Sequence, residues 1–444
     1  MLSRRRFLSL GPIAGLMVGP VLKAGTPTSP LGTGANSVDG TGDAQAPMPP
    51  SIAALASMKD KARPITNDER RARIEKARRL MTENKLSALM LTGGTSLAYF
   101  SNIRWGLSER LFAMILPVKG DPFFVVPAFE ADRAREQIEL GPFGGGRADV
   151  RLWEEDQSPY ARVGQGLKER GFIAGRLGIE ETVRFVFSDG VAKAAPALAQ
   201  VSATPVTAGC RGVKDAHELE LMRLAAGVTL RAYAAAFAAL KDGMTQAEFA
   251  ALVSAAHSRQ GFSGGAGVQV GAYSASPHGS IAPQTIRDGT ILLIDGGCNV
   301  EGYSSDLSRT FVLGKATDKM KQVFDIVHRA QEAAVKTARP GLACEAVDAA
   351  ARKVIVDAGY GPDYKYFSHR VGHGLGMDGH EWPYLVRGNK LPLQAGMTFS
   401  DEPGIYIRGE FGVRLEDDMV ITDSGAELLT PPSPSIETPF ADVR

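Results

Sequence analysis

Hydrophobic residues along the first half of the chain follow a pattern of short strands separated by helices. Apolar runs of strand length occupy residues 88–91, 112–116, 123–126 and 177–179, with helical patterns at 66–81, 129–140 and one that ends near Leu198. The first helix opens with Thr66-Asn67-Asp68-Glu69, the order of a capping box. Strands that alternate with helices predict an α/β domain over residues 65–207. We find no nucleophile elbow, phosphate-binding loop or metal-spaced cluster within it.

The second half begins with longer helical patterns. One runs from Lys214 to about Leu240 and the next from Thr245 to Gln260. Further elements are strands at 290–294 and 304–312, helices at 318–338 and 344–358, and closing strands around 405–407 and 413–421. This order predicts an α+β domain, a mixed sheet flanked by helices, over residues 208–444. No short internal repeat is visible, which excludes a solenoid.

The first 64 residues lack both patterns. Ser3-Arg4-Arg5-Arg6-Phe7-Leu8 precedes an apolar stretch that ends at Leu22, is interrupted by glycine and proline, and is too short to span a bilayer. The motif resembles a twin-arginine signal peptide (Tat signal), residues 1–24, which a receptor reads and which does not anchor the protein. We therefore expect a protein exported in folded form, periplasmic or secreted. Residues 25–64, rich in Gly, Pro, Ser, Thr and Ala, are predicted to form a disordered linker.

Composition narrows the function by exclusion. The 444 residues include 50 basic and 49 acidic side chains, a formal charge of +1, and no basic stripe with interleaved aromatics. This balance argues against a nucleic-acid partner. The three cysteines, Cys210, Cys298 and Cys344, are odd in number and widely spaced, so they suit neither a disulfide framework nor a thiolate metal site. We expect them to be reduced core residues.

Candidate chemistry gathers in the second domain. Asp295 ends a buried-looking strand, and Asp306 follows eleven residues later on the returning strand. His373 lies in a Gly-His-Gly-Leu-Gly turn, and Glu402 and Glu416 lie on or beside the closing strands. Four carboxylates gathered without metal would repel one another and force their own protonation. Two divalent cations would balance that charge, and the oxygen-rich set suits manganese, cobalt or zinc better than copper.

Each of these residues alone has an ordinary explanation as a turn former, a solvated carboxylate or a buried histidine. Their combined order and spacing resemble the pita-bread metallopeptidases, and most closely the proline-specific branch, the Xaa-Pro dipeptidases (prolidases) and aminopeptidase P. The resemblance covers roughly residues 66–430. The matching motifs are Asp295 with Asp306, Gly-His373-Gly-x-Gly with His380 seven residues on, Glu402 before Pro-Gly, Glu416 preceded by Arg414, and His278 seventeen residues before Asp295.

The resemblance implies a fold and a metal centre. The fold would be α+β, a pita-bread (creatinase/aminopeptidase) catalytic domain preceded by a smaller α/β creatinase-like N-terminal domain. Two divalent metal ions would be bound, with manganese expected and cobalt or zinc as alternatives. Asp295 would chelate one metal, Asp306, Glu402 and Glu416 would bridge or share both, and His373 would be the sole nitrogen ligand.

The resemblance also implies an activity, hydrolysis of the peptide bond before proline by a metal-bridging hydroxide. Glu402 would shuttle the proton, His380 would donate to the developing oxyanion, and His278 would hold the substrate backbone. Arg414 would orient ligands or the substrate carboxylate. The substrate would be a small peptide with proline in the second position.

Other implied features rest on fewer residues. Tyr303, near Asp306, is a candidate for substrate binding, and His369 and Asp401 are candidate partners of the metal ligands. A homodimer is expected, with no nucleic-acid partner and no stable membrane anchor.

The resemblance leaves the choice between dipeptidase and aminopeptidase open. The two glutamates are fourteen residues apart, as in short bacterial prolidases. Prolidases commonly carry an arginine between the second histidine and the first glutamate that binds the free carboxylate of proline. Arg387 is the only arginine in that stretch here.

Three alternatives stay open. A methionine-aminopeptidase-like or other metal-dependent hydrolase would share the five ligands, but the N-terminal domain and the export signal count against it. A creatinase-like hydrolase without metal is disfavoured because all five ligand positions are intact. A non-catalytic pita-bread binding protein would not need His278 and His380.

Overall fold

The computed structural model describes residues 47–443, so the predicted signal peptide, residues 1–24, lies outside the described residues. Two short helices, α1 (Pro50–Ala53) and η1 (Lys59–Lys61), fall within the predicted linker. Ile52 is fully buried against alanines of α8 and α9, and the Met58 amide donates to the Gln260 carbonyl at 2.9 Å. The prediction of a disordered linker is therefore wrong for residues 48–64, because isolated apolar residues in this stretch anchor it to the folded chain. Residues 25–46 of the predicted linker lie outside the described residues.

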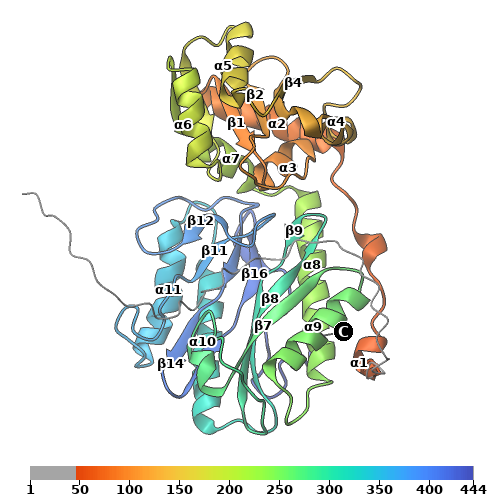
Figure 1. Cartoon of the computed structure of the whole chain (residues 1–444). Helices are drawn as coiled ribbons and strands as arrows, with labels where there is room; N and C mark the ends of the chain where they lie inside the picture. Colours follow the sequence, from red (N-terminus) through yellow and green to blue (C-terminus); the bar gives the residue numbers. More distant parts are fainter. Residues whose placement is uncertain (1–46, 444) are drawn as a thin grey trace, which may run out of the picture. The chain divides into compact units, whose positions relative to one another are not determined.

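The N-terminal part contains a six-stranded mixed sheet with strand order β4-β3-β2-β1-β5-β6 (Figure 1). Its strands are β1 (Ala88–Thr92), β2 (Ala113–Pro117), β3 (Phe123–Pro127), β4 (Asp149–Trp153), β5 (Gly175–Ile179) and β6 (Leu198–Ser202). Its helices are α2 (Asn67–Glu83), α3 (Thr95–Ser101), η2 (Ala128–Glu130), α4 (Ala131–Leu140), α5 (Pro159–Glu169), α6 (Phe185–Ala194) and α7 (Thr204–Arg211). The predicted α/β layout is present.

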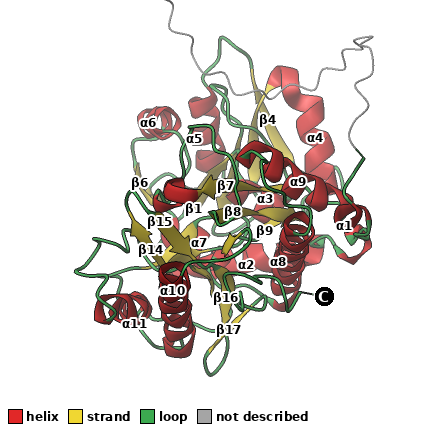
Figure 2. Cartoon of the chain, turned by 90° about the horizontal axis from the view of Figure 1, so that it is seen from below, coloured by secondary structure: helices red, strands yellow, loops and turns green. Residues whose placement is uncertain are grey.

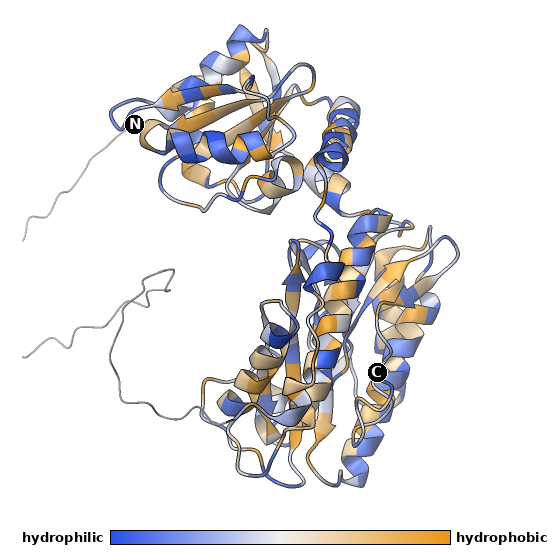
Figure 3. Cartoon of the chain, turned by 90° about the vertical axis from the view of Figure 1, so that its right-hand side faces the viewer, coloured by the Kyte–Doolittle hydropathy of each residue, from blue (hydrophilic) through white to orange (hydrophobic). Residues whose placement is uncertain are grey.

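Local sequence explains how this part begins and how its sheet is buried. The capping box predicted at Thr66 is present: its hydroxyl accepts from the Glu69 amide at 3.2 Å, and the Glu69 carboxylate accepts from the Thr66 amide at 2.6 Å. Strands β1, β2 and β3 are buried at every position. Figure 3 shows these strands as largely hydrophobic, while the outer faces of the flanking helices are hydrophilic.

Two predicted boundaries in this part are displaced. The helical pattern expected to end near Leu198 ends earlier, with α6, and Leu198 begins β6. The predicted boundary at 207/208 falls inside α7, because Val206 and Cys210 of that helix pack into the same apolar core as Ile74 and Met81 of α2. A helix that completes the N-terminal core thus continues past the point where the composition changes.

The C-terminal part carries two larger sheets and a two-stranded ribbon (Figure 2). The first has the order β10-β8-β7, with β9 paired to β8, the second is β12-β11-β13-β16-β17, and the ribbon is β14-β15. The strands are β7 (Gly264–Val270), β8 (Ile291–Val300), β9 (Tyr303–Ser304), β10 (Leu307–Val312), β11 (Gly372–Gly374), β12 (Glu381–Leu385), β13 (Thr398–Asp401), β14 (Gly404–Ile407), β15 (Phe411–Arg414), β16 (Asp417–Ile421) and β17 (Ala426–Leu428).

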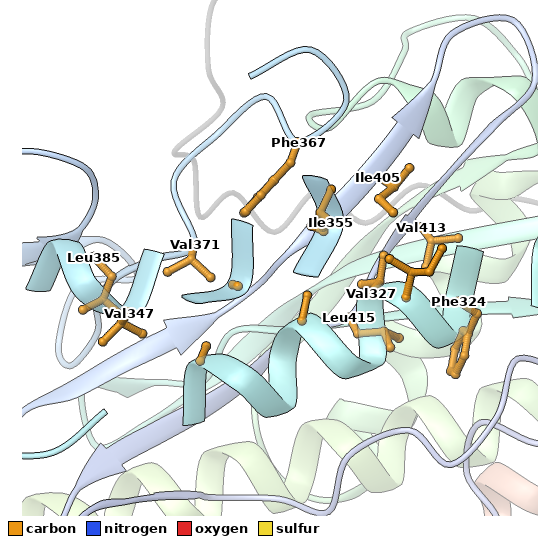
Figure 4. Packing of buried hydrophobic residues seen from close by; sticks show 14 of the residues in the cluster. Phe324, Val327, Val347, Ile355, Phe367, Val371, Leu385, Ile405, Val413 and Leu415 are labelled. Carbon is orange, nitrogen blue, oxygen red and sulfur yellow. The ribbon is translucent and has the colours of Figure 1, made fainter. Parts of the chain in front are cut away.

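The helices of this part are α8 (Ala216–Phe237), α9 (Gln246–Arg259), η3 (Gly271–Ala275), α10 (Asp318–Thr337) and α11 (Cys344–Asp357). Helices α10 and α11 bury apolar side chains against the closing strands, as Figure 4 shows for Phe324, Val327, Val347, Ile355, Ile405 and Val413. The predicted α+β layout is confirmed. No helix within residues 47–443 combines the length and the apolar character needed to cross a membrane.

Candidate active site

A cavity of about 490 Å³ opens in the C-terminal part, where the ends of several strands meet. It is lined by charged and histidine side chains far more than by apolar ones. The lining residues are Pro277, His278, Asp295, Asp306, His369, Arg370, His373, His380, Val386, Glu402, Arg414 and Glu416. All five predicted metal ligands are among them.

The strand pairing brings the five ligand side chains to one place. Asp295 lies within β8, and Asp306 lies in the short connection between β9 and β10, whose pairing sets Ser308 opposite Asp295. The other three come from the second sheet. His373 lies on β11, Glu402 directly follows β13, and Glu416 lies between β15 and β16, as the strand bounds show.

The donor atoms are close enough to share cations. Three sets of three side chains that could bind metal each have donor atoms within 4.8 Å of one another. These sets are Asp295 with Asp306 and Glu416, His373 with Glu402 and Glu416, and Asp306 with His373 and His380. His373 Nε2 lies 3.3 Å from Glu402 Oε1 and 3.9 Å from Asp306 Oδ2, while its Nδ1 lies 3.1 Å from the Gly374 carbonyl. A proton on Nδ1 would leave Nε2 free to face the carboxylates.

The electrostatics of the cluster call for positive charge. Burial, followed by repulsion from Asp295 and Glu402, raises the pKa of Asp306 well above its usual range. Burial also raises the pKa of Glu416 and raises that of Glu402 to about 7. Burial lowers the pKa of His373 to about 3, so its imidazole is neutral at physiological pH. Carboxylates that repel one another beside a neutral imidazole fit a site for divalent cations.

Arg414 and Ser308 hold the ligands in place. Arg414, 3% exposed, directs Nη2 to Asp295 Oδ2 at 2.6 Å and donates through Nε to Ser308 Oγ at 2.9 Å. The Ser308 hydroxyl lies 3.0 Å from Asp295 Oδ1 and 2.5 Å from Glu416 Oε2. Arg414 Nη1 donates to the Pro277 carbonyl and the Tyr406 hydroxyl. Through these contacts Arg414 orients the side chains of Asp295 and Ser308.

Three further histidines line the cavity. The ring of His380 stacks on that of His373 with centroids 3.7 Å apart, and His380 is the more exposed of the two. His369 Nε2 lies 2.7 Å from the Tyr406 hydroxyl, and its Nδ1 lies 3.7 Å from Glu402 Oε2. His278 is the third. The structure thus places His278 and His380 where they can touch a substrate, and His369 beside a ligand.

Other predicted residues lie elsewhere. Tyr303 is 1% exposed and does not line the cavity; its hydroxyl accepts from Arg73 and donates to Glu218, each at 2.7 Å. The prediction that Tyr303 binds substrate is therefore wrong, because the side chain turns into the core. Asp401 is fully buried beside Asp417, and neither oxygen of its carboxylate has a hydrogen-bond partner among residues 47–443. It therefore makes no hydrogen bond to a metal ligand within those residues.

Comparison with known proteins gives the family. Residues 220–423 match metallopeptidase family M24, and residues 73–213 match the creatinase/prolidase N-terminal domain. The probable dipeptidase PepE of Mycobacterium tuberculosis is 36% identical over 346 residues, which cover 77% of this chain and 89% of that protein. The chain belongs to metallopeptidase family M24. The M24 peptidase is also 31% identical to the Xaa-Pro dipeptidase of Lactobacillus delbrueckii subsp. lactis, over 80% of this chain and 96% of the relative.

Solved structures agree with this family. The M24 peptidase superimposes on dipeptidase PepE from Mycobacterium ulcerans with a TM-score of 0.79 and 33% identity, covering 84% and 99% of the two chains. A prolidase from Thermococcus sibiricus gives a TM-score of 0.73 at 30% identity, covering 83% of this chain and 97% of that one. The predicted fold class, a pita-bread catalytic domain preceded by a creatinase-like N-terminal domain, is confirmed. The M24 peptidase is a hydrolase, and its family implies divalent metal ions.

Sequence reasoning missed several residues of the site. Ser308 could have been found, because the pairing of β8 and β10 sets it opposite Asp295 on the same sheet. Tyr406 and Val386 carried no signal, since their place in the M24 peptidase depends on how distant segments pack. Arg370 was missed although it lies only three residues before His373. A basic residue in such a loop is ordinarily solvated, and only the cavity shows otherwise.

Proposed function

We propose that the M24 peptidase hydrolyses the peptide bond before proline in short peptides and uses two divalent metal ions, manganese by preference. The names of two relatives support this, the Xaa-Pro dipeptidases of Lactobacillus delbrueckii subsp. lactis and Pyrococcus horikoshii. The cavity supports it as well, because it holds two histidines, His278 and His380, beside the five ligand side chains. A site that only stored metal would have no need of them.

One observation carries the proposal. Four carboxylates and one imidazole line a single cavity, and burial with mutual repulsion raises the pKa values of Asp306, Glu402 and Glu416. This is the charge pattern of a site built for more than one cation. When bound there, divalent cations would supply Lewis acidity, lowering the pKa of a water and offsetting negative charge on the substrate oxygen.

The chain's own residues then do the remaining work. Glu402 accepts a proton from the attacking water and passes it to the leaving proline nitrogen; His369 Nδ1 lies 3.7 Å from its Oε2. Burial and Arg370 lower the pKa of His380, so the ring is neutral and can donate a hydrogen bond to the carbonyl oxygen before proline. Arg414 and Ser308 keep Asp295 and Glu416 in register throughout. His278 lines the cavity and contacts the substrate backbone.

The test is mass spectrometry of the products formed from Gly-Pro, Ala-Pro and Ala-Pro-Ala with added manganese, and Ala-Ala as the control. We expect cleavage before proline and little cleavage of Ala-Ala. Equal cleavage of Ala-Ala would remove the proline preference. No cleavage of any peptide by metal-loaded protein would contradict the proposal.

We also propose that the M24 peptidase is exported in folded form through its twin-arginine motif, a segment that lies outside the described residues. The buried thiols Cys210, Cys298 and Cys344 are compatible with folding in a reducing compartment before export. Replacing Arg4 and Arg5 by lysine should leave folded precursor in the cytoplasm, as fractionation would show. Undiminished export of that variant would contradict this route.

A further inference from the structure

Helix α11 carries a buried ion pair that the proposed reaction does not use. Arg352 donates through Nε and Nη2 to the two carboxylate oxygens of Asp348, at 3.1 and 3.0 Å. The two residues are 5% and 1% exposed. Neither lines the active-site cavity; both border a separate cavity of about 630 Å³, lined mainly by α11. The pair therefore has no direct contact with a substrate bound at the candidate metal ligands.

An ion pair of this kind is a costly way to hold a helix in place. The desolvation of two buried charges offsets much of their attraction, and well-packed apolar side chains often stabilise a protein as well or better. Aromatic rings shield the Arg352 guanidinium, with Cζ 4.2 Å from the ring centroid of Phe367 and 4.4 Å from that of Tyr364. Apolar side chains could pack there too, but they could not make the hydrogen bonds that the pair makes.

These hydrogen bonds go to the loop before β11. Arg352 donates to the carbonyls of Phe367 and His369, at 2.8 and 2.7 Å. In the opposite sense, the Val371 amide donates to Asp348 Oδ1 at 3.0 Å. Alternate residues of the loop are thus tied to one helix, so the ion pair fixes the path of the loop backbone.

The same loop also contacts the proposed catalytic groups. The Val371 carbonyl accepts from the Glu402 amide at 2.8 Å. His369 Nε2 lies 2.7 Å from the Tyr406 hydroxyl, and its Nδ1 lies 3.7 Å from Glu402 Oε2. Both the backbone and the carboxylate of Glu402 therefore lie beside loop residues that the ion pair holds.

We propose that Asp348 and Arg352 are positioning residues for Glu402, which they reach through the loop before β11. The assignment rests on the proposed function, in which Glu402 carries the proton. A displacement of about 1 Å in a reacting group can cost about 10²-fold in rate. The ion pair therefore supports kcat from outside the cavity, without contact with the substrate.

The test removes the hydrogen bonds without leaving a buried charge unpaired. The pair variant, Asp348→Val/Arg352→Met, is matched by a control variant, Lys353→Met/Asp357→Val, which makes the same exchange in an exposed ion pair of α11. At saturating manganese, kcat of the pair variant for Ala-Pro should fall by about 10²-fold with little change in KM. The control variant should match the wild type. Arg352→Lys, which keeps the charge without the planar fork, should fall between the pair variant and the wild type.

Hydrogen exchange gives a readout that does not depend on activity. Peptides that contain the Val371 and Glu402 amides should take up deuterium faster in the pair variant than in the wild type, because the Val371 amide loses its acceptor and the loop is no longer tied to α11. If the pair variant does not fold, Arg352→Lys provides the same two comparisons, with smaller changes in the same direction.

Unchanged exchange in these peptides would overturn the proposal, as would wild-type kcat in a variant whose exchange has risen. An equal loss of kcat in the control variant would also overturn it, because the effect would then belong to α11 as a whole. A wild type that cleaves no peptide would overturn the proposed function and the catalytic role assigned to the pair. The exchange data would in that case still show whether the pair holds the loop.

Discussion

The sheet of the N-terminal part and the second sheet of the C-terminal part are both buried, yet they bury different chemistry. Strands β1, β2 and β3 contain only hydrophobic residues apart from Thr92, and all of their positions are buried. Strands β13 and β16 bury Asp401, Asp417 and Asp418, with Glu416 beside them. Apolar burial stabilises a fold at about 25 cal/mol per Å². Buried carboxylates cost free energy unless a cation or hydrogen bonds compensate them.

The compensation in the second sheet is local and incomplete. Asp417 pairs with Arg309 at 2.6 Å, and both side chains are fully buried. Asp418 accepts from the Asp306 amide at 3.2 Å, so it holds the backbone of a candidate metal ligand. The carboxylates of the cavity itself have Arg414 as their one close arginine partner among the described residues. The N-terminal sheet therefore contributes stability through apolar burial. The second C-terminal sheet contains a cluster of carboxylates that lowers stability, and bound metal would offset their repulsion.

The largest effect should come from removing a ligand. Asp295→Ala and His373→Ala should each lower kcat/KM by about 10³-fold or more. Each variant loses a ligand of the metal ions, which stabilise transition-state charge by several kcal/mol. Both variants should also bind less metal, as elemental analysis would show. Asp325→Ala, an exposed carboxylate on α10, is the control and should behave as the wild type. Full activity with unchanged metal content in either ligand variant would rule out the five-ligand assignment.

His380→Ala should produce the next largest effect. If His380 donates to the oxyanion without binding metal, kcat and kcat/KM should fall together by about 10²–10³-fold, while metal content stays normal. His328→Ala, on α10 and outside the cavity lining, is the matched control. The alternative is that His380 itself binds metal, because it belongs to one of the three donor sets, with Asp306 and His373. Loss of metal from His380→Ala would show that this alternative is correct.

A core substitution in the N-terminal sheet should show the opposite pattern. Phe124 on β3 is fully buried and meets Phe143 edge to face at 5.9 Å. Phe124→Ala should lower the free energy of unfolding by about 3–5 kcal/mol, because a large cavity is left in an apolar core. Activity per folded molecule should not change. Denaturant melts alongside kinetics check this, and a kcat loss as large as that of His380→Ala would erase the contrast between the two regions.

Metal removal should make the charge cluster visible in stability. Burial raises the pKa of Glu402 in the folded metal-free protein from its ordinary value of 4.5 to about 7, so the folded state binds more protons than the unfolded state between those values. Stability of the chelated protein should therefore fall as pH rises from about 5 to 8, by on the order of 2 kcal/mol. Thermal melts of the metal-loaded enzyme should lack this trend. A chelated protein whose stability rises over that range would contradict the cluster's electrostatics.

The fold class and the five candidate metal ligands could be predicted from the sequence, but the contacts between side chains of the site could not. Asp295, Asp306, His373, Glu402 and Glu416 could be grouped because their spacing matches a family pattern, and the structure brings them onto one cavity. Strand and helix periods were enough for the two-domain layout. They could not reveal that residues 48–64 are ordered, because single buried residues such as Ile52 produce no helical or strand periodicity in the sequence.

Long-range contacts account for what the sequence missed. Tyr303 stands close to Asp306 in the chain, yet the strand turns its ring toward Arg73 and Glu218. Arg387 lies between His380 and Glu402, where the family resemblance points to a substrate-binding arginine, and Arg370 lies outside that stretch. Only the packing of β12 against the loop before β11 shows which of the two guanidiniums enters the cavity.

The most direct test of the central claim, that these five side chains bind two metal ions which drive hydrolysis, is a titration of the chelated enzyme with manganese. Bound metal and cleavage of Ala-Pro are followed together. We predict that activity returns as binding approaches two ions per chain, and that Asp295→Ala reaches fewer. Full activity in metal-free protein, or tight binding of two ions by Asp295→Ala with normal turnover, would contradict the claim.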